Sequence, residues 1–270
     1  MSLIDNTNNL TTKLAALWRK VKTKATAQGA SIDNTDSITQ IVDKMPSEVL
    51  QHIKLSKNET VKGNAIDYLI NDVCSSIVLP ANAYAYFSGF NINTYSSTID
   101  GNNVTSALSL FNGCTLGDMS NLSLPNATNL ASSFMYAIYN KIDLSVSKKL
   151  KQAGNMFAYS AGNGVIISAD SITEMNGMFV GALKTYNILI YNLGMQQSCA
   201  INSATFSTSQ WGQGSAKARQ SLVDSLLTYS FDRAAAGYAA LTITLPAASL
   251  ALLTGAEKAA ITAKGFTLAS

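Results

Sequence analysis

The sequence predicts an α+β protein in which an N-terminal helical hairpin is followed by a short β/α solenoid and a C-terminal cap. Three observations predict this fold: an amphipathic pattern near the start, a phenylalanine-centred signature that recurs in the middle, and mixed helix and strand patterns at the end. Of 270 residues, only 13% are charged, which is roughly half the average for soluble domains. So low a charged fraction favours a protein whose surface is partly covered by other subunits.

The first predicted element is an amphipathic helix over residues 10–26. Gly29 stands where a helix C-cap is expected, and a second helix begins at the capping box of Ser37 and Gln40 and ends at Pro46. We expect residues 1–48 to be a docking or oligomerisation module. Its docking face is the apolar stripe of the first helix: Leu10, Leu14, Leu17, Trp18 and Val21.

The other face of this first helix is basic. Contact with nucleic acid or an anionic membrane is one interpretation, and a solvated face beside an oligomer contact is the one we favour. The formal net charge of the whole chain is only +3. We therefore predict no nucleic-acid partner.

Residues 49–100 are predicted as a transition segment with a strand at 77–79 before Pro80. It ends in an aromatic cluster of Tyr84, Tyr86, Phe87 and Phe90. Because Phe87 precedes Phe111 by about one repeat length, the cluster reads as a degenerate first repeat. A sugar-binding platform is the alternative, and core packing is the favoured account.

The repeats occupy residues 101–200, and their anchors are Phe111, Phe134, Phe157 and Phe179, which follow one another at a nearly constant step. Apolar residues recur seven and four positions before each anchor, and an alternating apolar pair follows about ten positions later. Units this short must stack to share a core. We expect a helical turn before each anchor and a strand after it, which is the leucine-rich-repeat geometry. The array should break at Phe206, which follows the last anchor by more than one repeat length.

A C-terminal α/β cap is predicted over residues 201–270, since a solenoid needs an atypical unit to cover its end. Its elements are a helix over 216–229, a strand over 241–245, a helix from the capping box of Thr254 and Glu257 to Gly265, and a strand over 266–268. The uncharged stretch 234–256 contains a period-two strand pattern. We therefore predict no membrane span in it.

Metal and cofactor sites are not predicted. The cysteines Cys74, Cys114 and Cys199 are far apart, and His52 is the single histidine. A zinc site needs about four closely spaced nitrogen or sulfur ligands, so we expect the cysteines to be small core residues. Glycine-rich phosphate-binding motifs do not occur in the sequence.

Catalysis by carboxylates is the enzymatic alternative, because some solenoids cleave polysaccharides. Asp170 and Glu174 are the nearest acidic pair in the repeats, and Asp118 and Asp143 lie in other repeats. Asp170 can instead cap the helical turn that follows it. We predict no catalytic residues and a protein that is not an enzyme.

Three segments resemble known proteins. The run Glu174 to Phe179, with its Met-Phe pair, resembles the BspA-like leucine-rich repeats of surface proteins. The run Leu253 to Leu268 is similar to a closing unit of such proteins, which gut bacteria and their phages encode. Residues 13–45 are similar to helical modules that open many phage structural proteins, and together the resemblance covers about three quarters of the chain.

The resemblance implies a structural protein of a bacteriophage virion, made in the host cytoplasm and located in the virion. A tail fibre, receptor-binding or baseplate part is favoured over head decoration. Its expected partners are other virion proteins, further copies of itself and a host cell-surface glycan. A bacterial surface adhesin is the alternative, although residues 1–10 show no export signal, and a polysaccharide depolymerase is less favoured.

Overall fold

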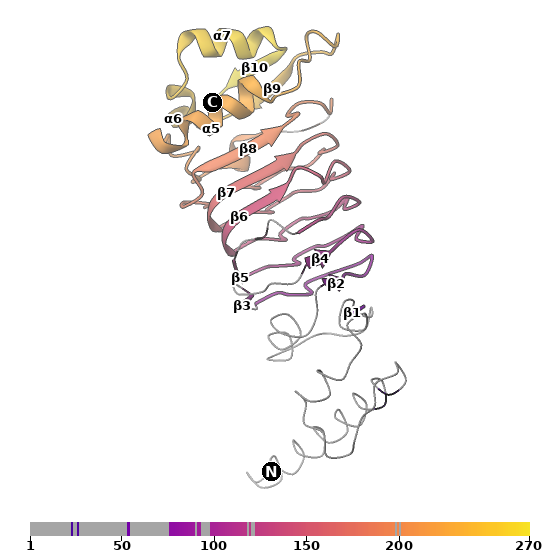
Figure 1. Ribbon diagram of the computed structural model, residues 1–270. Helices are drawn as coiled ribbons and strands as arrows, with labels where there is room; N and C mark the ends of the chain where they lie inside the picture. The colour runs from indigo at the N-terminus through magenta and orange to yellow at the C-terminus, as the bar shows by residue number, and fades with distance from the viewer. Residues whose placement is uncertain are drawn as a thin grey trace.

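The computed structural model describes residues 23, 26, 53–54, 76–89, 91–92, 98–117, 119, 122–197, 199 and 201–270. In these ranges strands and helices are mixed, with strands side by side along the repeats and helices gathered toward the C-terminus (Figure 1). Several predicted features lie outside the described residues. They are the whole docking face (Leu10, Leu14, Leu17, Trp18 and Val21), the second helix over 37–45, His52, Cys74, Phe90 and Asp118.

One parallel sheet runs through the repeats, because each repeat contributes a strand after its phenylalanine. Its order is β3 (Asn91–Ile92), β5 (Thr115–Leu116), β6 (Ile138–Leu144), β7 (Ala161–Ser168) and β8 (Asn187–Tyr191). Neighbouring strands pair one repeat apart, with Ile138 opposite Ala161 and Val165 opposite Ile188. A second parallel sheet joins β1 (Ile53–Lys54), β2 (Ser76–Val78) and β4 (Thr98–Asp100).

The expected helical turn before each phenylalanine is wrong for the described repeats. We call the residues from four before to two after each phenylalanine the turn segment. Its φ angles are positive two residues before and two residues after the ring, as at Ser132 (56°) and Tyr136 (59°) around Phe134. An α-helix needs consecutive negative φ angles. The backbone therefore bonds between repeats, and the Phe134 N–H donates to the Met156 carbonyl oxygen at 2.9 Å.

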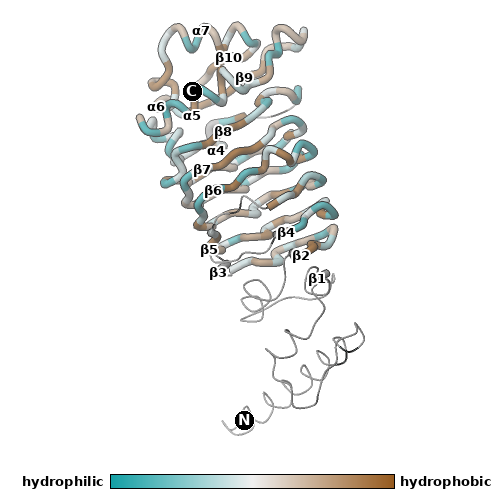
Figure 2. The backbone as a smooth tube through the Cα atoms, in the orientation of Figure 1, coloured by the Kyte–Doolittle hydropathy of each residue, from teal (hydrophilic) through white to brown (hydrophobic). Residues whose placement is uncertain are grey.

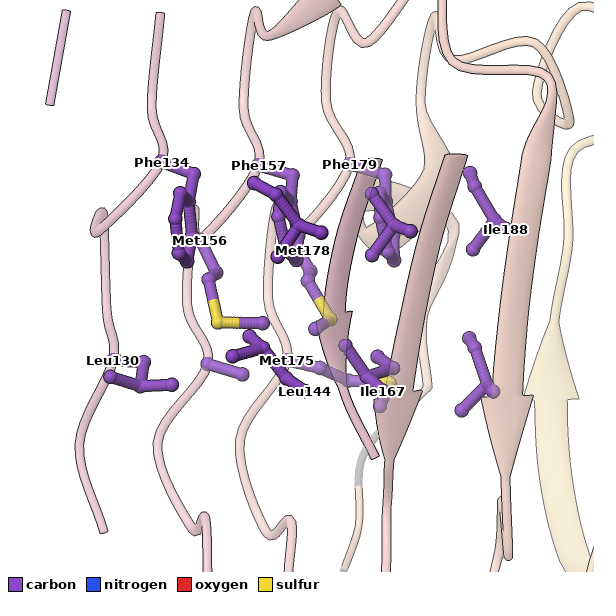
Figure 3. Close-up of a cluster of buried hydrophobic side chains, with 14 of the residues drawn as sticks. Leu130, Phe134, Leu144, Met156, Phe157, Ile167, Met175, Met178, Phe179 and Ile188 are labelled. Atoms are coloured by element: carbon purple, nitrogen blue, oxygen red, sulfur yellow. The ribbon is translucent and has the colours of Figure 1, made fainter. Parts of the chain in front are cut away.

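The phenylalanines of successive repeats form one stack in the core (Figure 3). Ring centroids lie 5.4 Å apart for Phe111 and Phe134, 5.2 Å for Phe134 and Phe157, and 5.4 Å for Phe157 and Phe179. Phe87 continues the stack at 5.2 Å from Phe111, where the sequence predicted a degenerate first repeat. Near-parallel stacked rings add to the energy of burial, so each repeat is held by the ring of its neighbour.

The other apolar positions of the repeat are buried beside this stack, and hydrophobic residues recur along β6, β7 and β8 (Figure 2). The buried set comprises Val104, Ala127, Leu150 and Ile172; Ala107, Leu130, Ala153 and Met175; and the pairs Leu122 and Leu124, Ile142 and Leu144, Val165 and Ile167, and Ile188 and Ile190. Each repeat thus supplies one slice of a continuous core.

The stack does not end where the repeat spacing changes. Phe206 lies in α4 (Ser203–Phe206), and its ring stacks on Phe179 at 5.7 Å. Trp211 then packs on Phe206 at 4.7 Å and closes the stack. The Phe179 N–H still donates to the Thr205 carbonyl oxygen, at 2.8 Å. The longer spacing therefore changes the path of the chain between Phe179 and Phe206, but their rings still stack in sequence order.

The C-terminal part covers β8 with short helices and a separate pair of strands. Its elements are η1 (Ala216–Ala218), α5 (Arg219–Val223), η2 (Asp224–Thr228), β9 (Leu241–Thr244), α6 (Ala247–Ala251), α7 (Gly255–Ala263) and β10 (Phe266–Ala269). β9 and β10 pair in parallel. The capping box of Thr254 and Glu257 is confirmed, with the Thr254 N–H donating to the Glu257 carboxylate at 2.8 Å. Among the described helices, none is long and apolar enough to cross a bilayer.

Two cationic side chains, Arg233 and Lys264, stabilise this C-terminal part by donating hydrogen bonds to backbone carbonyl oxygens. The buried guanidinium of Arg233 donates to the backbone carbonyl oxygens of Gly194 and Ala239, the latter at 2.7 Å. The Lys264 ammonium donates to the Leu227 and Ser230 carbonyl oxygens at 2.7 and 2.9 Å. A buried charge is tolerated when its donors are satisfied. Arg233 therefore ties the segment after η2 to the loop that follows β8.

Candidate functional site

Asp170 and Asp143, two of the carboxylates considered for catalysis, hold local structure. Asp170 Oδ1 accepts hydrogen bonds from Ser168 Oγ at 2.5 Å and from Asn192 Nδ2 at 2.6 Å. The side chain thus joins the end of β7 to the next repeat, and the helical turn that it was expected to cap is not formed. Asp143 Oδ1 accepts from the Ser145 N–H at 3.0 Å, which closes the turn after β6.

Glu174, the other member of the considered acidic pair, is exposed, and its backbone bridges to Gln152 of the preceding repeat. Its Oε1 lies 3.0 Å from the position that a Cβ on Gly154 would occupy. The side chain therefore extends over the backbone of the neighbouring repeat, at a place where glycine leaves room for it.

The early aromatic cluster divides between core and surface. Phe87 is buried in the stack, and Tyr86 packs edge-on against it with ring centroids 5.6 Å apart. Tyr84 points outward and is 62% exposed. The favoured core-packing account therefore holds for Tyr86 and Phe87, and Tyr84 is a single exposed ring.

A different pair of tyrosines occupies an unusual backbone position. Two residues after each phenylalanine, φ is positive, and three repeats place glycine there: Gly89, Gly113 and Gly181. The two repeats between the latter glycines carry Tyr136 (φ 59°) and Tyr159 (φ 56°) instead. Thr208 takes the same position after Phe206 with φ 54°, so the left-handed backbone, which costs a residue with a Cβ about 1–2 kcal/mol, belongs to the repeat.

The rings of these two tyrosines stack on the outside of the molecule. Their centroids are 5.2 Å apart with an interplanar angle of 10°, and Tyr136 and Tyr159 are 54% and 55% exposed. One end of the pair is covered, because a Cβ added to Gly181 would fall 2.4 Å from the Tyr159 ring. A Cβ added to Gly113 would meet nothing within 4 Å, so the Tyr136 end is open.

Two exposed aliphatic side chains extend this pair into a strip across three adjacent repeats. Ile138 begins β6 and is 56% exposed, and Leu183 follows Gly181 by two residues and is 46% exposed. We call Tyr136, Ile138, Tyr159 and Leu183 the tyrosine strip. Large apolar side chains that gather on a surface mark interaction sites more often than scattered ones do.

A row of amides lies beside the tyrosine strip on the strands. Asn140, Asn163 and Asn187 are exposed on β6, β7 and β8, and Asn140 follows Ile138 by two residues on the same face. Asn163 Nδ2 donates to Asn140 Oδ1 at 2.6 Å, and Asn187 Nδ2 donates to the Asn163 carbonyl oxygen at 3.2 Å. We call these three residues the amide row. Asn140 and Asn163 hold donors and acceptors one repeat apart, whereas Asn187 is in register with Gly164, one position further along the strand.

A buried hydroxyl cluster supports the strip from inside. The Tyr139 hydroxyl lies 3.1 Å from Ser160 Oγ and 3.3 Å from Thr185 Oγ1. A Cβ on Gly162 would meet the Tyr139 ring at 2.0 Å, so this strand position requires glycine. Burial raises the pKa of Tyr139 to about 12, because an ionised phenol is poorly solvated there.

The described cysteines lie in the core, as the sequence predicts. Cys114 Sγ donates to the Phe87 carbonyl oxygen at 2.7 Å. Burial raises the pKa of Cys199 to about 11, which disfavours its reactive thiolate. Among the residues that the structure describes, no group of three or more His, Cys, Asp or Glu side chains could hold a metal ion.

Comparison with known proteins gives no relative from which to assign this surface. The chain matches no family model, no curated protein and no solved structure. The surface is therefore assigned from its own geometry and chemistry.

Sequence reasoning singled out the buried repeat anchors and missed the tyrosine strip. Tyr136 and Tyr159 are separated by the same step as the anchors Phe134 and Phe157. That shared register is the signal in the sequence that could have identified them. It places both tyrosines at the same point of adjacent repeats, although their exposure follows only from the left-handed turn.

Proposed function

We propose that this chain is a structural component of a bacteriophage virion, a tail fibre, receptor-binding or baseplate part in preference to head decoration. In this proposal the N-terminal helices, with their face of Leu10, Leu14, Leu17, Trp18 and Val21, dock the chain onto other virion proteins or onto its own copies. The repeats form a solenoid that contacts the host surface. The tyrosine strip is the observation that carries the contact role.

The repeat geometry supports a role based on area. Parallel pairing places equivalent residues of adjacent repeats side by side, as with Ile138 and Ala161. A surface feature that recurs in the sequence therefore becomes a line on the molecule. The stacked rings of Tyr136 and Tyr159 form such a line, with Ile138 and Leu183 as further exposed apolar side chains and the amide row beside them.

The low charge and the sequence resemblance support the assembly role. Charged residues make up 13% of the chain, which suits a protein held among other subunits. A homo-oligomer would present several copies of the strip in one particle. Because linked sites bind together, weak contacts at each copy would add to a much stronger overall attachment.

The experiment measures assembly of the full chain and of a variant lacking residues 1–46. We expect light scattering and negative-stain images to show a closed oligomer of elongated bodies for the full chain. The truncated chain should lose helical signal and assembly, but its repeats should keep a cooperative unfolding transition. Antibody labelling of particles purified from a lysate containing this protein should place the full chain on the virion. A stable monomer that does not associate with particles would contradict the proposal.

A further inference from the structure

We propose that the tyrosine strip and the amide row together bind a pyranose-containing polysaccharide. Sugar rings would stack on the Tyr136 and Tyr159 pair, and their hydroxyl groups would bond to Asn140 and Asn163. This inference rests on the proposed function for its biological setting, since it names the ligand class of the host contact. The structural argument for it uses only the described residues.

The backbone position of these tyrosines does not require a tyrosine side chain. Their position has positive φ, and the repeats on both sides fill it with Gly113 and Gly181. Glycine adopts this conformation without the steric cost that a tyrosine incurs. The side chains recover little of that cost by burial, because both rings are more than half exposed. Positive φ is shared by other residues of the turn segments, such as Ser132 and Asn155, so it is the exposure of the two stacked rings that favours contact with a ligand.

The shape of the pair suits a flat ring ligand. The Tyr159 end lies on Gly181, whereas the space beside Gly113 is open to at least 4 Å around a built Cβ. The outer face of Tyr136 is therefore available at the next step of the stack. A pyranose presents an apolar face of C–H groups, whose positive edges match the negative face of an aromatic ring. Ile138, two residues after Tyr136 at the start of β6, adds another exposed apolar side chain beside the pair.

The polar neighbours match the hydroxyl groups of a sugar. An amide both donates and accepts hydrogen bonds, as a sugar hydroxyl does. Asn140 and Asn163 stand on adjacent strands at the edge of the strip, and their amides already bond to each other at 2.6 Å. This contact fixes their orientation before a ligand arrives, which lowers the entropy lost on binding.

The test compares variants of the full chain in native gels containing dextran, alginate or bacterial lipopolysaccharide. The double variant Tyr136→Gly with Tyr159→Gly removes both rings and relieves the left-handed strain, so its fold should persist. The matched control is Tyr84→Ala, which removes a ring that is 62% exposed and lies two repeats away from Tyr136. A second variant, Asn140→Ala with Asn163→Ala, removes the hydroxyl partners and keeps the rings.

We expect at least one of the three polysaccharides to retard the wild type and Tyr84→Ala equally. The tyrosine double variant should bind at least tenfold more weakly, and the amide variant should be weakened as well. Equal retardation of the wild type and the tyrosine variant would overturn the inference. So would migration of the wild type that none of the three polysaccharides changes.

Light scattering on the same samples separates this inference from the proposed function. A changed oligomer mass in the tyrosine double variant would make the strip an interface between copies and overturn the glycan assignment. Loss of polysaccharide binding with particle association intact would support the assignment. Polysaccharide binding by a chain that never enters a particle would refute the virion role and leave the glycan site standing.

Discussion

The stacked phenylalanines should act as coupled neighbours in stability measurements, and Phe157 is the best place to test this. Its buried ring stacks on Phe134 at 5.2 Å and on Phe179 at 5.4 Å. Phe157→Leu keeps most of the apolar volume but removes both stacking contacts. Each contact is worth about 0.5–1.5 kcal/mol beyond area burial. We therefore expect the free energy of unfolding to fall by about 2 kcal/mol.

A double-mutant cycle isolates the stacking energy from the loss of volume. Each single variant, Phe134→Leu or Phe157→Leu, already removes the contact between these two rings. The double variant should therefore lose about 0.5–1.5 kcal/mol less than the sum of the two single losses. Phe111→Leu with Phe179→Leu is the matched control, because these two rings do not touch each other. The control losses should add to within about 0.5 kcal/mol.

Urea unfolding followed by far-ultraviolet circular dichroism measures all the variants. Their free energies of unfolding can be compared if each falls with urea concentration at the same slope. Coupling near zero in the adjacent pair would refute the reasoning. Equal coupling in both pairs would refute it too, because the energy would then reflect general loosening of the repeats.

Five further variants test other parts of the fold by the same measurement. Arg233→Met should lower the free energy of unfolding by about 2–4 kcal/mol, because it leaves buried carbonyl oxygens without donors. Arg219→Met, which breaks a partly exposed ion pair, should cost under about 1 kcal/mol. Gly212→Ala should cost about 1–3 kcal/mol, since its Cβ would lie 2.1 Å from a backbone oxygen, and Gly255→Ala, with open space around it, should be nearly neutral. Raising the pH from about 10 to 12 should cost the wild type on the order of 2 kcal/mol more than Tyr139→Phe. The folded pKa of Tyr139, about 12, exceeds its ordinary value of 10.0, so its stability contribution is complete below pH 10 and is lost above it. Equal pH profiles for the two proteins would contradict this assignment.

The apolar period of the sequence was enough to predict the buried positions of the repeat. Phe134 and Phe157 lie one repeat step apart and stack in the core, because a fixed period puts equivalent side chains in register. The period does not determine the path of the chain between them. Helical turns were predicted, whereas Ser132 and Asn155 take positive φ and direct their backbone groups to the next repeat. Propensity gives only partial warning of this, since Asn tolerates left-handed backbone but neither residue is glycine.

The candidate site was harder to predict than the core. The spacing of acidic pairs and glycine motifs can indicate chemistry. Asp170, one of the acidic candidates, instead connects two repeats through its hydrogen bond with Asn192. Tyr136 and Tyr159 carry no motif, and tyrosine is found both buried and exposed. Their exposure depends on a left-handed turn that brings each ring outward. The site is therefore a consequence of backbone conformation, which residue type alone does not reveal.

The hydrogen bonds of the turn segments align peptide dipoles along the repeats. The Phe111 N–H donates to the Ser133 oxygen, the adjoining Phe134 N–H donates to Met156, and the Phe157 N–H donates to Met178. These peptide groups form a continuous column whose N–H bonds all point toward the C-terminal end. Residues four before, two before and two after each phenylalanine form similar columns, whereas strand peptides alternate and largely cancel.

Each peptide carries a dipole of about 3.5 D, so aligned columns add as they do along an α-helix. The sense is reversed with respect to the chain, because an α-helix directs its N–H groups toward its N-terminus. This side of the array is therefore positive toward the C-terminal end and negative toward the first repeat. Added acidic residues should be best tolerated near the last repeat, and added basic residues near the first.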